Sequence, residues 1–117
     1  MMVLTKAPFD RCLHLYPVDE WHDVEQRLIE LARQYPEYRN TVRDIARNTI
    51  SVQYDNQGRV LIPERLLNYA TISRDAAIIG MLNYIEIWAP DELELQQAKN
   101  PPLDEQGFKD LPVDLKF

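Results

Sequence analysis

The chain of 117 residues has the length of one compact domain, and 45% hydrophobic and 27% charged residues with only 3 glycines exclude a disordered or fibrous protein. The single cysteine, Cys12, excludes an internal disulfide and suits a reducing cytoplasm. No apolar run approaches the roughly 20 residues of a membrane helix, and MMVLTKAPFD lacks the apolar region of a signal peptide, so we expect a chain that is neither exported nor embedded.

The net charge of −6 argues against a nucleic-acid partner, because affinity for phosphate usually comes from clustered lysine and arginine. The acidity, however, is concentrated at the C-terminal end. From Glu86 onward there are 8 acidic residues and 3 lysines, which account for −5 of the total. Between Arg33 and Arg65 the chain carries 6 arginines and 4 acidic residues. The net charge therefore does not exclude DNA binding by the middle of the chain.

Two stretches of the chain share one pattern. Residues 12–21, CLHLYPVDEW, and residues 84–93, YIEIWAPDEL, each combine an alternating apolar strand, an aromatic residue, a nearby proline and an Asp-Glu pair. Acidic residues in a first helical turn complement the free N–H groups and the helix dipole, so both pairs predict a helix start. The offset of 72 residues indicates one supersecondary unit that occurs twice. In this repeat His14 occupies the position of Glu86, an outward-facing strand site.

The first copy of this unit is expected to be incomplete. The second copy is preceded by the apolar strand AAIIGML (76–82), a short helix and a hairpin, whereas only MMVLTKAPFDR stands before the first. The counterpart of residues 51–74 would precede Met1. The pattern therefore predicts a duplicated module without its first hairpin.

Two helices are expected between the copies. A second helix is predicted to open at Pro36, and on it Arg39, Arg43 and Arg47 follow one another at four-residue intervals as a basic row. A solvated face is the simpler interpretation of this row, and a phosphate contact is the alternative. The first helix is expected to end before Pro36. It is predicted from apolar residues that recur every three or four positions: Trp21, Val24, Leu28, Leu31 and Tyr35.

A hairpin is predicted from residue 50 to residue 62. Ile50, Val52 and Tyr54 alternate with polar residues, which is typical of a strand with one buried face. Gly58 supplies the turn because glycine adopts positive φ without strain. The all-apolar stretch 60–62 predicts a second strand that is covered on both faces.

A short helix is predicted after the hairpin, with Pro63 at its first position. Its residues Leu66, Leu67 and Ala70 are expected to face inward. Beyond Ala98 the segment NPPLDEQGFKDLPVDLKF is acidic and rich in proline, and predicts an irregular tail. The sequence leaves open whether its apolar residues dock on the body or on a partner: Phe108, Leu111, Val113 and Phe117.

The chain resembles the MraZ family of bacterial regulators, whose members carry two swapped-hairpin modules of the AbrB type. The most specific motif is D-x-x-x-R followed by an apolar stretch and Ile-Pro, within YDNQGRVLIPERLLNYA (54–70). The match departs from the family at Thr71, where glycine is usual, and in the absent first-copy hairpin. It covers residues 3 to about 95 and includes three other matching features: CLHLYPVDEW (12–21), Arg43 and IIGMLNYIEIW (78–88).

The resemblance implies a sequence-specific DNA-binding repressor of transcription. Such proteins bind short direct repeats upstream of the division and cell-wall gene cluster, as ring-shaped homo-oligomers in the cytoplasm and at the nucleoid. The expected partners are duplex DNA and further copies of the chain, with no cofactor, membrane or small-molecule substrate. The family's motif acid falls on Asp55 and its motif arginine on Arg59. We add Arg65 and Arg43 as further expected DNA contacts.

Roles without DNA also fit the residues of the chain. Asp55 and Arg59 are compatible with an exposed ion pair that merely caps a turn, worth under about 1 kcal/mol. Cys12 is expected to be a small core residue, and neither His14 nor His22 has a partner at the spacing of metal ligands, so we expect neither an enzyme nor a metal site. The stronger alternative is an antitoxin-like or other protein-binding AbrB-fold module with weak or no DNA binding, whose tail (100–117) wraps a partner.

These observations together predict an α+β fold of duplicated AbrB-like swapped-hairpin β modules with an intervening pair of helices, the first copy being incomplete. Residues 1–21 are expected to be the remnant of the first module, residues 22–48 the helical connection, residues 49–96 the second module, and residues 97–117 the acidic, proline-rich tail.

Overall fold

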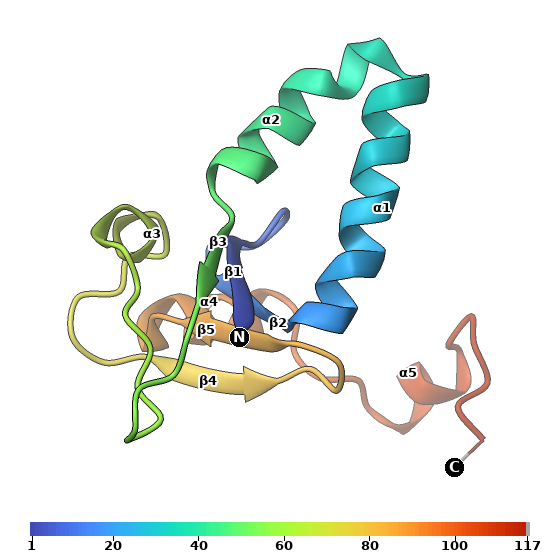
Figure 1. Cartoon of the computed structure of the whole chain (residues 1–117). Coiled ribbons are helices and arrows are strands. Elements are labelled where there is room, and N and C mark those ends of the chain that lie inside the picture. Colours follow the sequence, from blue (N-terminus) through green and yellow to red (C-terminus); the bar gives the residue numbers. More distant parts are fainter. Residues whose placement is uncertain (117) are drawn as a thin grey trace.

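The protein is an α+β protein built on one five-stranded antiparallel sheet with strand order β3-β1-β2-β5-β4 (Figure 1). This computed structural model describes residues 1–116. The strands are β1 (Met2–Lys6), β2 (Leu13–Pro17), β3 (Ile50–Val52), β4 (Ala77–Gly80) and β5 (Ile85–Trp88). The α-helices are α1 (Val18–Gln34), α2 (Arg39–Arg47), α3 (Glu64–Tyr69), α4 (Pro90–Lys99) and α5 (Glu105–Lys109).

The centre of the sheet is the pairing of β2 with β5, the two strands of the predicted repeat. His14 lies directly opposite Glu86, and the flanking pairs are Leu13 with Ile87 and Leu15 with Ile85. This register is symmetrical, because His14 and Glu86 occupy the same position of the repeat and lie opposite each other at the middle of the pairing. The expected α+β class is confirmed, while the duplication and the four-part division of the chain stay predictions.

The sheet buries a different set of side chains on each face. One face is apolar and is closed by α3, whose Leu66 and Ala70 are completely buried, as expected. On the opposite face Cys12 packs with Ala7 and Trp88, which agrees with its expected role as a core residue. The apolar face takes its buried residues from four strands: Leu4, Leu13, Leu15, Val52 and Ile87.

The expected outward orientation of His14 and Glu86 is wrong. Their exposed fractions are 7% and 8%, so both lie in the interior on the same face as Cys12. The prediction followed from alternation within each strand, which shows which residues share a face but not which face is exposed to solvent. Here the second face is covered as well, so the sheet is buried on both sides at its centre.

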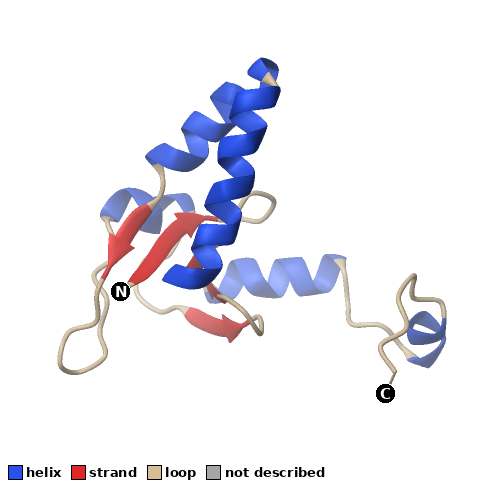
Figure 2. Ribbon diagram, turned by 45° about the vertical axis from the view of Figure 1, so that its right-hand side comes forward, coloured by secondary structure: helices blue, strands red, loops and turns tan. Residues whose placement is uncertain are grey.

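Two helices project from the sheet as an antiparallel pair (Figures 1 and 2). Helix α1 begins after Pro17 with Asp19 and Glu20 in its first turn, and it ends at Gln34, as predicted. A single 3-10 turn, Pro36–Tyr38, then leads into α2.

Asp91 and Glu92 likewise occupy the first turn of α4, as predicted from the repeat. None of the helices in residues 1–116 is long and apolar enough to cross a membrane.

The segment after the Gly58 turn differs from the prediction. Residues 60–62 form no strand, because no strand within the described residues pairs with them. Val60 and Ile62 still pack against the apolar core, but Leu61 is 89% exposed, so the expectation that both faces are covered is wrong. The preceding strand stops at Val52 and leaves Tyr54 exposed. Pro63 is the N-cap of α3 rather than its first residue.

Helix α3 ends in a Schellman motif that carries threonine where glycine is favoured. The N–H of Ile72 donates to Leu67 O at 2.9 Å, and the N–H of Thr71 donates to Asn68 O at 3.2 Å. This geometry forces Thr71 to φ 57°, in the left-handed region. A β-branched residue in that region is strained by roughly 1–3 kcal/mol.

Replacing Thr71 by glycine should therefore stabilise the protein. We expect the free energy of unfolding to rise by about 1 kcal/mol, and Tm by about 4 °C, measured by urea and thermal unfolding. Thr41→Gly is the matched control, since Thr41 lies within α2 and glycine there should lower stability by a few tenths of a kcal/mol. A Thr71→Gly protein no more stable than the wild type would show that Thr71 is not strained.

The C-terminal segment is less irregular than predicted, because it contains α5. The Asp104 carboxylate caps this helix by accepting the N–H of Gly107 at 2.8 Å. Leu111 is partly buried, and four other apolar side chains of the tail are exposed: Leu103, Phe108, Val113 and Leu115. Phe117, which the sequence suggested as a docking residue, lies outside the described residues.

The chain is more open than a compact monomer. Its radius of gyration is 16.4 Å, against about 13.4 Å for a compact domain of this length. Its accessible surface of 8978 Å² exceeds by about 2,300 Å² the value typical of a monomer of this mass. The projecting α1–α2 pair and the extended C-terminal segment are visible sources of this excess (Figure 2).

Candidate nucleic-acid interface

The Asp55–Arg59 segment forms a closed, protruding turn. The N–H of Asp55 donates to Arg59 O at 2.9 Å, and the N–H of Gly58 donates to Asp55 O at 3.1 Å. Gly58 has φ 77°, the left-handed conformation for which glycine was predicted at this position. Backbone hydrogen bonds thus hold the turn without the help of a neighbouring strand.

The Asp55 carboxylate organises the same turn from within. Its Oδ1 accepts the N–H of Gln57 at 2.9 Å and the N–H of Arg59 at 2.8 Å. Its Oδ2 accepts a hydrogen bond from the Nε–H of the Arg59 guanidinium at 2.7 Å. One carboxylate therefore fixes both the backbone of the turn and the direction of the arginine side chain.

The Arg59 guanidinium is held in place yet remains available to a partner. Its side chain is 73% exposed and that of Asp55 is 41% exposed. Because the carboxylate engages only Nε, the two terminal nitrogens of the guanidinium have no hydrogen-bond acceptor within residues 1–116. An arginine in this state presents two adjacent N–H donors, the arrangement that matches two acceptors on a guanine edge or a phosphate.

These contacts also lower the pKa of Asp55. The backbone N–H of Arg59 has the largest effect, followed by the Arg59 side chain, and the N–H of Gln57 adds to both. The folded turn therefore favours the ionised carboxylate. Its contribution is present above the ordinary pKa of an aspartate and is lost as the pH falls through the lowered value. At neutral pH the Asp55–Arg59 pair is intact.

The other two expected DNA contacts lie away from this tip. Arg65, on α3, donates Nη2 to Arg47 O at 3.0 Å and so satisfies a carbonyl at the end of α2. Arg43 lies on α2 and donates to Asn40 Oδ1 at 2.7 Å. Helix α2 and the hairpin tip lie beyond opposite ends of β3 (Figures 1 and 2). The structure thus brings Asp55 and Arg59 together, and it does not bring Arg43 to them.

The basic row of α2 is exposed but partly engaged within the chain. Arg39 donates Nε to Ala32 O at 2.9 Å, which ties the start of α2 to α1. The Arg43 side chain donates to Asn40 Oδ1, whereas Arg47 is engaged through its backbone carbonyl, by Arg65. At least part of the row therefore has a structural use, and the phosphate contact stays a prediction.

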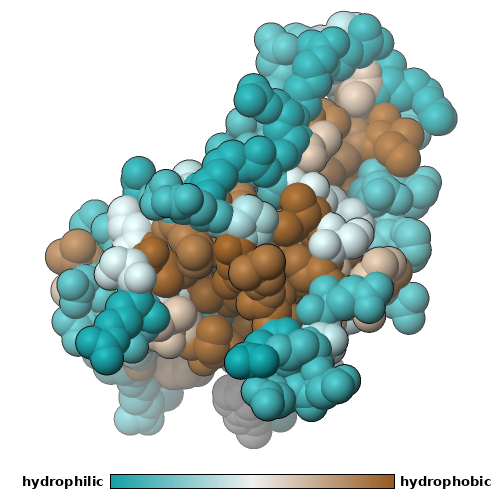
Figure 3. Space-filling model, turned by 60° about the vertical axis from the view of Figure 1, so that its left-hand side comes forward, coloured by the Kyte–Doolittle hydropathy of each residue, from teal (hydrophilic) through white to brown (hydrophobic). Residues whose placement is uncertain are grey.

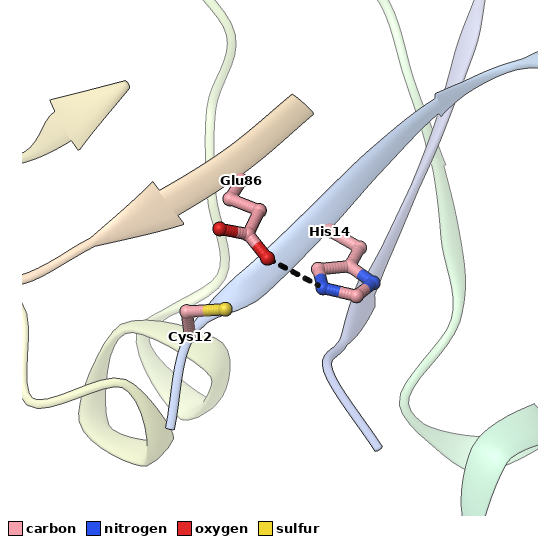
Figure 4. A group of neighbouring side chains, drawn as sticks. All are labelled: Cys12, His14 and Glu86. Atoms are coloured by element: carbon pink, nitrogen blue, oxygen red, sulfur yellow. Dashed lines mark ion pairs between the residues drawn. The ribbon is translucent and has the colours of Figure 1, made fainter. Parts of the chain in front are cut away.

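Sequence reasoning missed a second group of chemically active side chains, in the interior. Cys12, His14 and Glu86 each offer one donor atom, and these atoms all lie within 4.8 Å of one another (Figure 4). Burial, with smaller effects of Glu86 and Asp10, raises the pKa of the Cys12 thiol to about 12. Burial also lowers the pKa of His14, against the opposing charge of Glu86. The signal in the sequence was the shared repeat position of His14 and Glu86, which the antiparallel register turns into a contact.

The fold and the tip define a class of protein: a small α+β chain with a central antiparallel sheet that presents an arginine from a preorganised hairpin turn. Within this class the chain belongs to the MraZ family. The family model described as "MraZ protein, putative antitoxin-like" matches residues 45–108. That range contains the Asp55–Arg59 turn, α3 and the β4–β5 hairpin.

Curated relatives support the same family. The chain is 36% identical over 105 residues to the transcriptional regulator MraZ of Thermomicrobium roseum, covering 86% of this chain and 73% of the relative. It is 38% identical to the transcriptional regulator MraZ of Clostridium tetani, covering 79% of this chain and 64% of the relative. For that of Pelotomaculum thermopropionicum the identity is 41%, with 79% and 63% covered. The chain thus spans less than two thirds of the length of the last two relatives. Relatives named as regulators agree with the prediction that the chain is not an enzyme.

Proposed function

We propose that the chain is a regulator of transcription that binds duplex DNA through the tip of its Asp55–Arg59 hairpin. Its relatives are named transcriptional regulators, which supports the general role. The observation that carries the DNA contact is the 2.7 Å Arg59 Nε to Asp55 Oδ2 bond on a guanidinium that is otherwise exposed. A preorganised donor loses little side-chain entropy when it binds, so it reads a base or clamps a phosphate at low cost.

One hairpin tip makes few contacts, so we propose that several copies act together in a homo-oligomer. After the first contact, the others form within one complex at high effective concentration. The excess surface of about 2,300 Å² supports assembly. Apolar side chains gather over the sheet and beneath the helical pair (Figure 3). Ile78 on the edge strand β4 and Leu61 beside the tip are also exposed, and such surfaces favour self-association.

The proposed DNA target is a set of short direct repeats upstream of the division and cell-wall gene cluster, where binding represses transcription. A ring of identical hairpins matches a series of identical sites, because each copy meets the same sequence. The proposal also explains how a subunit with net charge −6 binds DNA, since the contact is made by a protruding tip rather than by the whole surface. The protein would then act in the cytoplasm, at the nucleoid.

The proposal is tested with the purified chain and two fluorescent duplexes, one carrying the repeats upstream of the host's gene cluster and one with the same bases scrambled. Anisotropy titrations should give at least about 100-fold tighter binding to the repeats, with affinity falling as salt rises from about 50 to 200 mM. Light scattering after size exclusion should give an oligomer. Equal binding to both duplexes, or a monomer that ignores DNA at low salt, would reject the proposal.

A second candidate function is a protein-binding module like an antitoxin. The description of the matching family includes antitoxin-like, and the tail after residue 100 combines acidic residues with exposed apolar side chains such as Phe108 and Val113. Such a segment suits a tail that orders on a protein partner. This function would use the tail rather than the hairpin tip.

Deleting residues 100–117 distinguishes the two functions. For a DNA-binding regulator we expect the affinity for the repeat duplex to change less than about threefold, because α5 and the tail lie apart from the tip (Figure 1). The measurement is the same anisotropy titration, with circular dichroism as a check of folding. A truncated chain that keeps its fold but loses DNA binding would contradict the assignment of the contact to Arg59.

A further inference from the structure

We propose that Cys12, His14 and Glu86 form a binding site for a divalent transition metal ion, with Zn²⁺ as the best match. The site lies in the interior of the sheet and is independent of the hairpin tip. Cys12 and His14 lie two residues apart, on the same face at β2, and Glu86 enters from β5 directly opposite His14. Figure 4 shows the three side chains pointing toward one another. Within residues 1–116 this is the one such group of three potential ligands.

The first argument is an unsatisfied nitrogen. Nε2 of His14 is buried and has no hydrogen-bond partner within the described residues, and the side chain is only 9% exposed. Oε2 of Glu86 lies 3.5 Å away without hydrogen-bond alignment, and the two groups form an ion pair only when His14 is protonated. A buried polar atom without a partner is costly, so a ligand for this nitrogen would remove a real penalty. Two ligands of one Zn²⁺ ion lie about 3.3–3.5 Å apart, which is the separation found here.

The second argument is the support given to the ligands by their neighbours. Trp88 Nε1 donates to Glu86 Oε1 at 2.9 Å, which leaves Oε2 free and turned toward His14. Nδ1 of His14 lies 3.3 Å from the hydroxyl of Tyr16. With the proton on Nδ1, the imidazole donates to that hydroxyl and presents the lone pair of Nε2 to an ion. Metal-bound histidines and carboxylates are usually held by outer partners of this kind.

The third argument is the chemistry of the donor set. A thiolate, an imidazole and a carboxylate together favour Zn²⁺ over Mg²⁺ or Ca²⁺, which prefer oxygen ligands. The charges of one thiolate and one carboxylate cancel those of a divalent ion, so the filled site is neutral and suited to burial. Binding requires loss of the Cys12 proton, which passes to the solvent. The widest donor separation, at most 4.8 Å, closes to tetrahedral spacing with side-chain shifts of about 1 Å.

Neither histidine has a second ligand at a recognised spacing along the chain, which is why no metal site was expected. The pairing of β2 with β5 supplies that ligand from 72 residues away. An ion at this site would join the β1–β2 hairpin to the β4–β5 hairpin, across a pairing that spans only three residues of each strand. Metal binding would therefore stabilise the centre of the sheet.

The test uses the full chain, stripped with a chelator and titrated with Zn²⁺ against a chromophoric competitor. We expect one equivalent of Zn²⁺ per chain and a rise in Tm when it binds. With Co²⁺ in place of Zn²⁺, a thiolate-to-cobalt absorption band should appear in the near ultraviolet. Cys12→Ser should abolish the band and weaken Zn²⁺ binding at least about 100-fold, and Glu86→Gln, which keeps the acceptor for Trp88, at least about 10-fold.

His22→Ala is the matched control, because His22 is an exposed histidine on α1 that contacts Glu25 at 3.7 Å. This variant should bind Zn²⁺ as the wild type does. Circular dichroism establishes that each variant is folded before its affinity is compared. Absence of stoichiometric binding by the wild type would overturn the site. So would a folded Cys12→Ser chain with undiminished affinity, since the ion would then be bound elsewhere.

Discussion

Arg59→Ala is expected to abolish the preference of the protein for repeat-containing DNA. An arginine that forms two hydrogen bonds to one base favours that base over the others by about 1–3 kcal/mol. An oligomer without this arginine loses that free energy at every repeat to which it binds. The affinity for the repeat duplex should therefore fall at least about 100-fold, toward that for scrambled DNA. Anisotropy titrations with both duplexes measure the change. The oligomer size should be unaltered, because the side chain is 73% exposed and, within residues 1–116, bonds only to Asp55.

Two variants separate this effect from a general loss of positive charge. Arg27→Ala removes the same charge from an exposed position of α1 and should change the affinity for the repeat duplex less than about threefold. Arg59→Lys retains the charge but not the planar fork, so it should keep salt-dependent binding while losing most of the preference for the repeats. Equal losses in Arg59→Ala and Arg27→Ala would show that bulk charge, and not the tip, governs binding.

Asp55→Asn examines the other half of the pair. The amide oxygen of asparagine can still accept the N–H groups of Gln57 and Arg59, so the turn should persist. The amide nitrogen cannot accept Nε of Arg59, so the guanidinium is no longer held in one direction. The expected loss of affinity is therefore smaller than that of Arg59→Ala, and it separates orientation from the presence of the arginine.

Features determined by neighbours in the chain could be predicted from the sequence. The turn at Gly58 depends on the conformational freedom of one residue and on a carboxylate four positions from its partner. The starts of α1 and α4 depend on acidic residues in the first turn, and the end of α1 depends on Pro36. These features follow from local chemistry, which is why the structure agrees with each of them.

Features that depend on distant segments could not be predicted in the same way. Alternation in β2 and β5 located two strand faces, but only the register between strands 72 residues apart shows that His14 and Glu86 meet in the interior. Residues 60–62 have the composition of a buried strand, yet a strand requires a partner. Within residues 1–116 none is supplied, so Leu61 stays exposed.

The position of the hairpin tip depends on how firmly α3 is docked, and Leu66 is the residue that docks it. Leu66 is completely buried on the apolar face of the sheet, among residues that include Leu4 and Val52. Helix α3 has only six residues, so its stability comes from this packing rather than from its own helix propensity. Loss of the Leu66 side chain should therefore affect both the core and the chain that leads from the tip.

Leu66→Ala is expected to lower the free energy of unfolding by about 3 kcal/mol, measured by urea unfolding. That is a large part of the roughly 5–15 kcal/mol available to a domain of this size. Leu95→Ala is the matched control, because Leu95 on α4 is 56% exposed and should change stability by less than about 0.5 kcal/mol. Equal effects of the two substitutions would mean that α3 does not close the apolar face. A loss confined to Leu66→Ala would support α3 as the element that anchors the hairpin to the sheet.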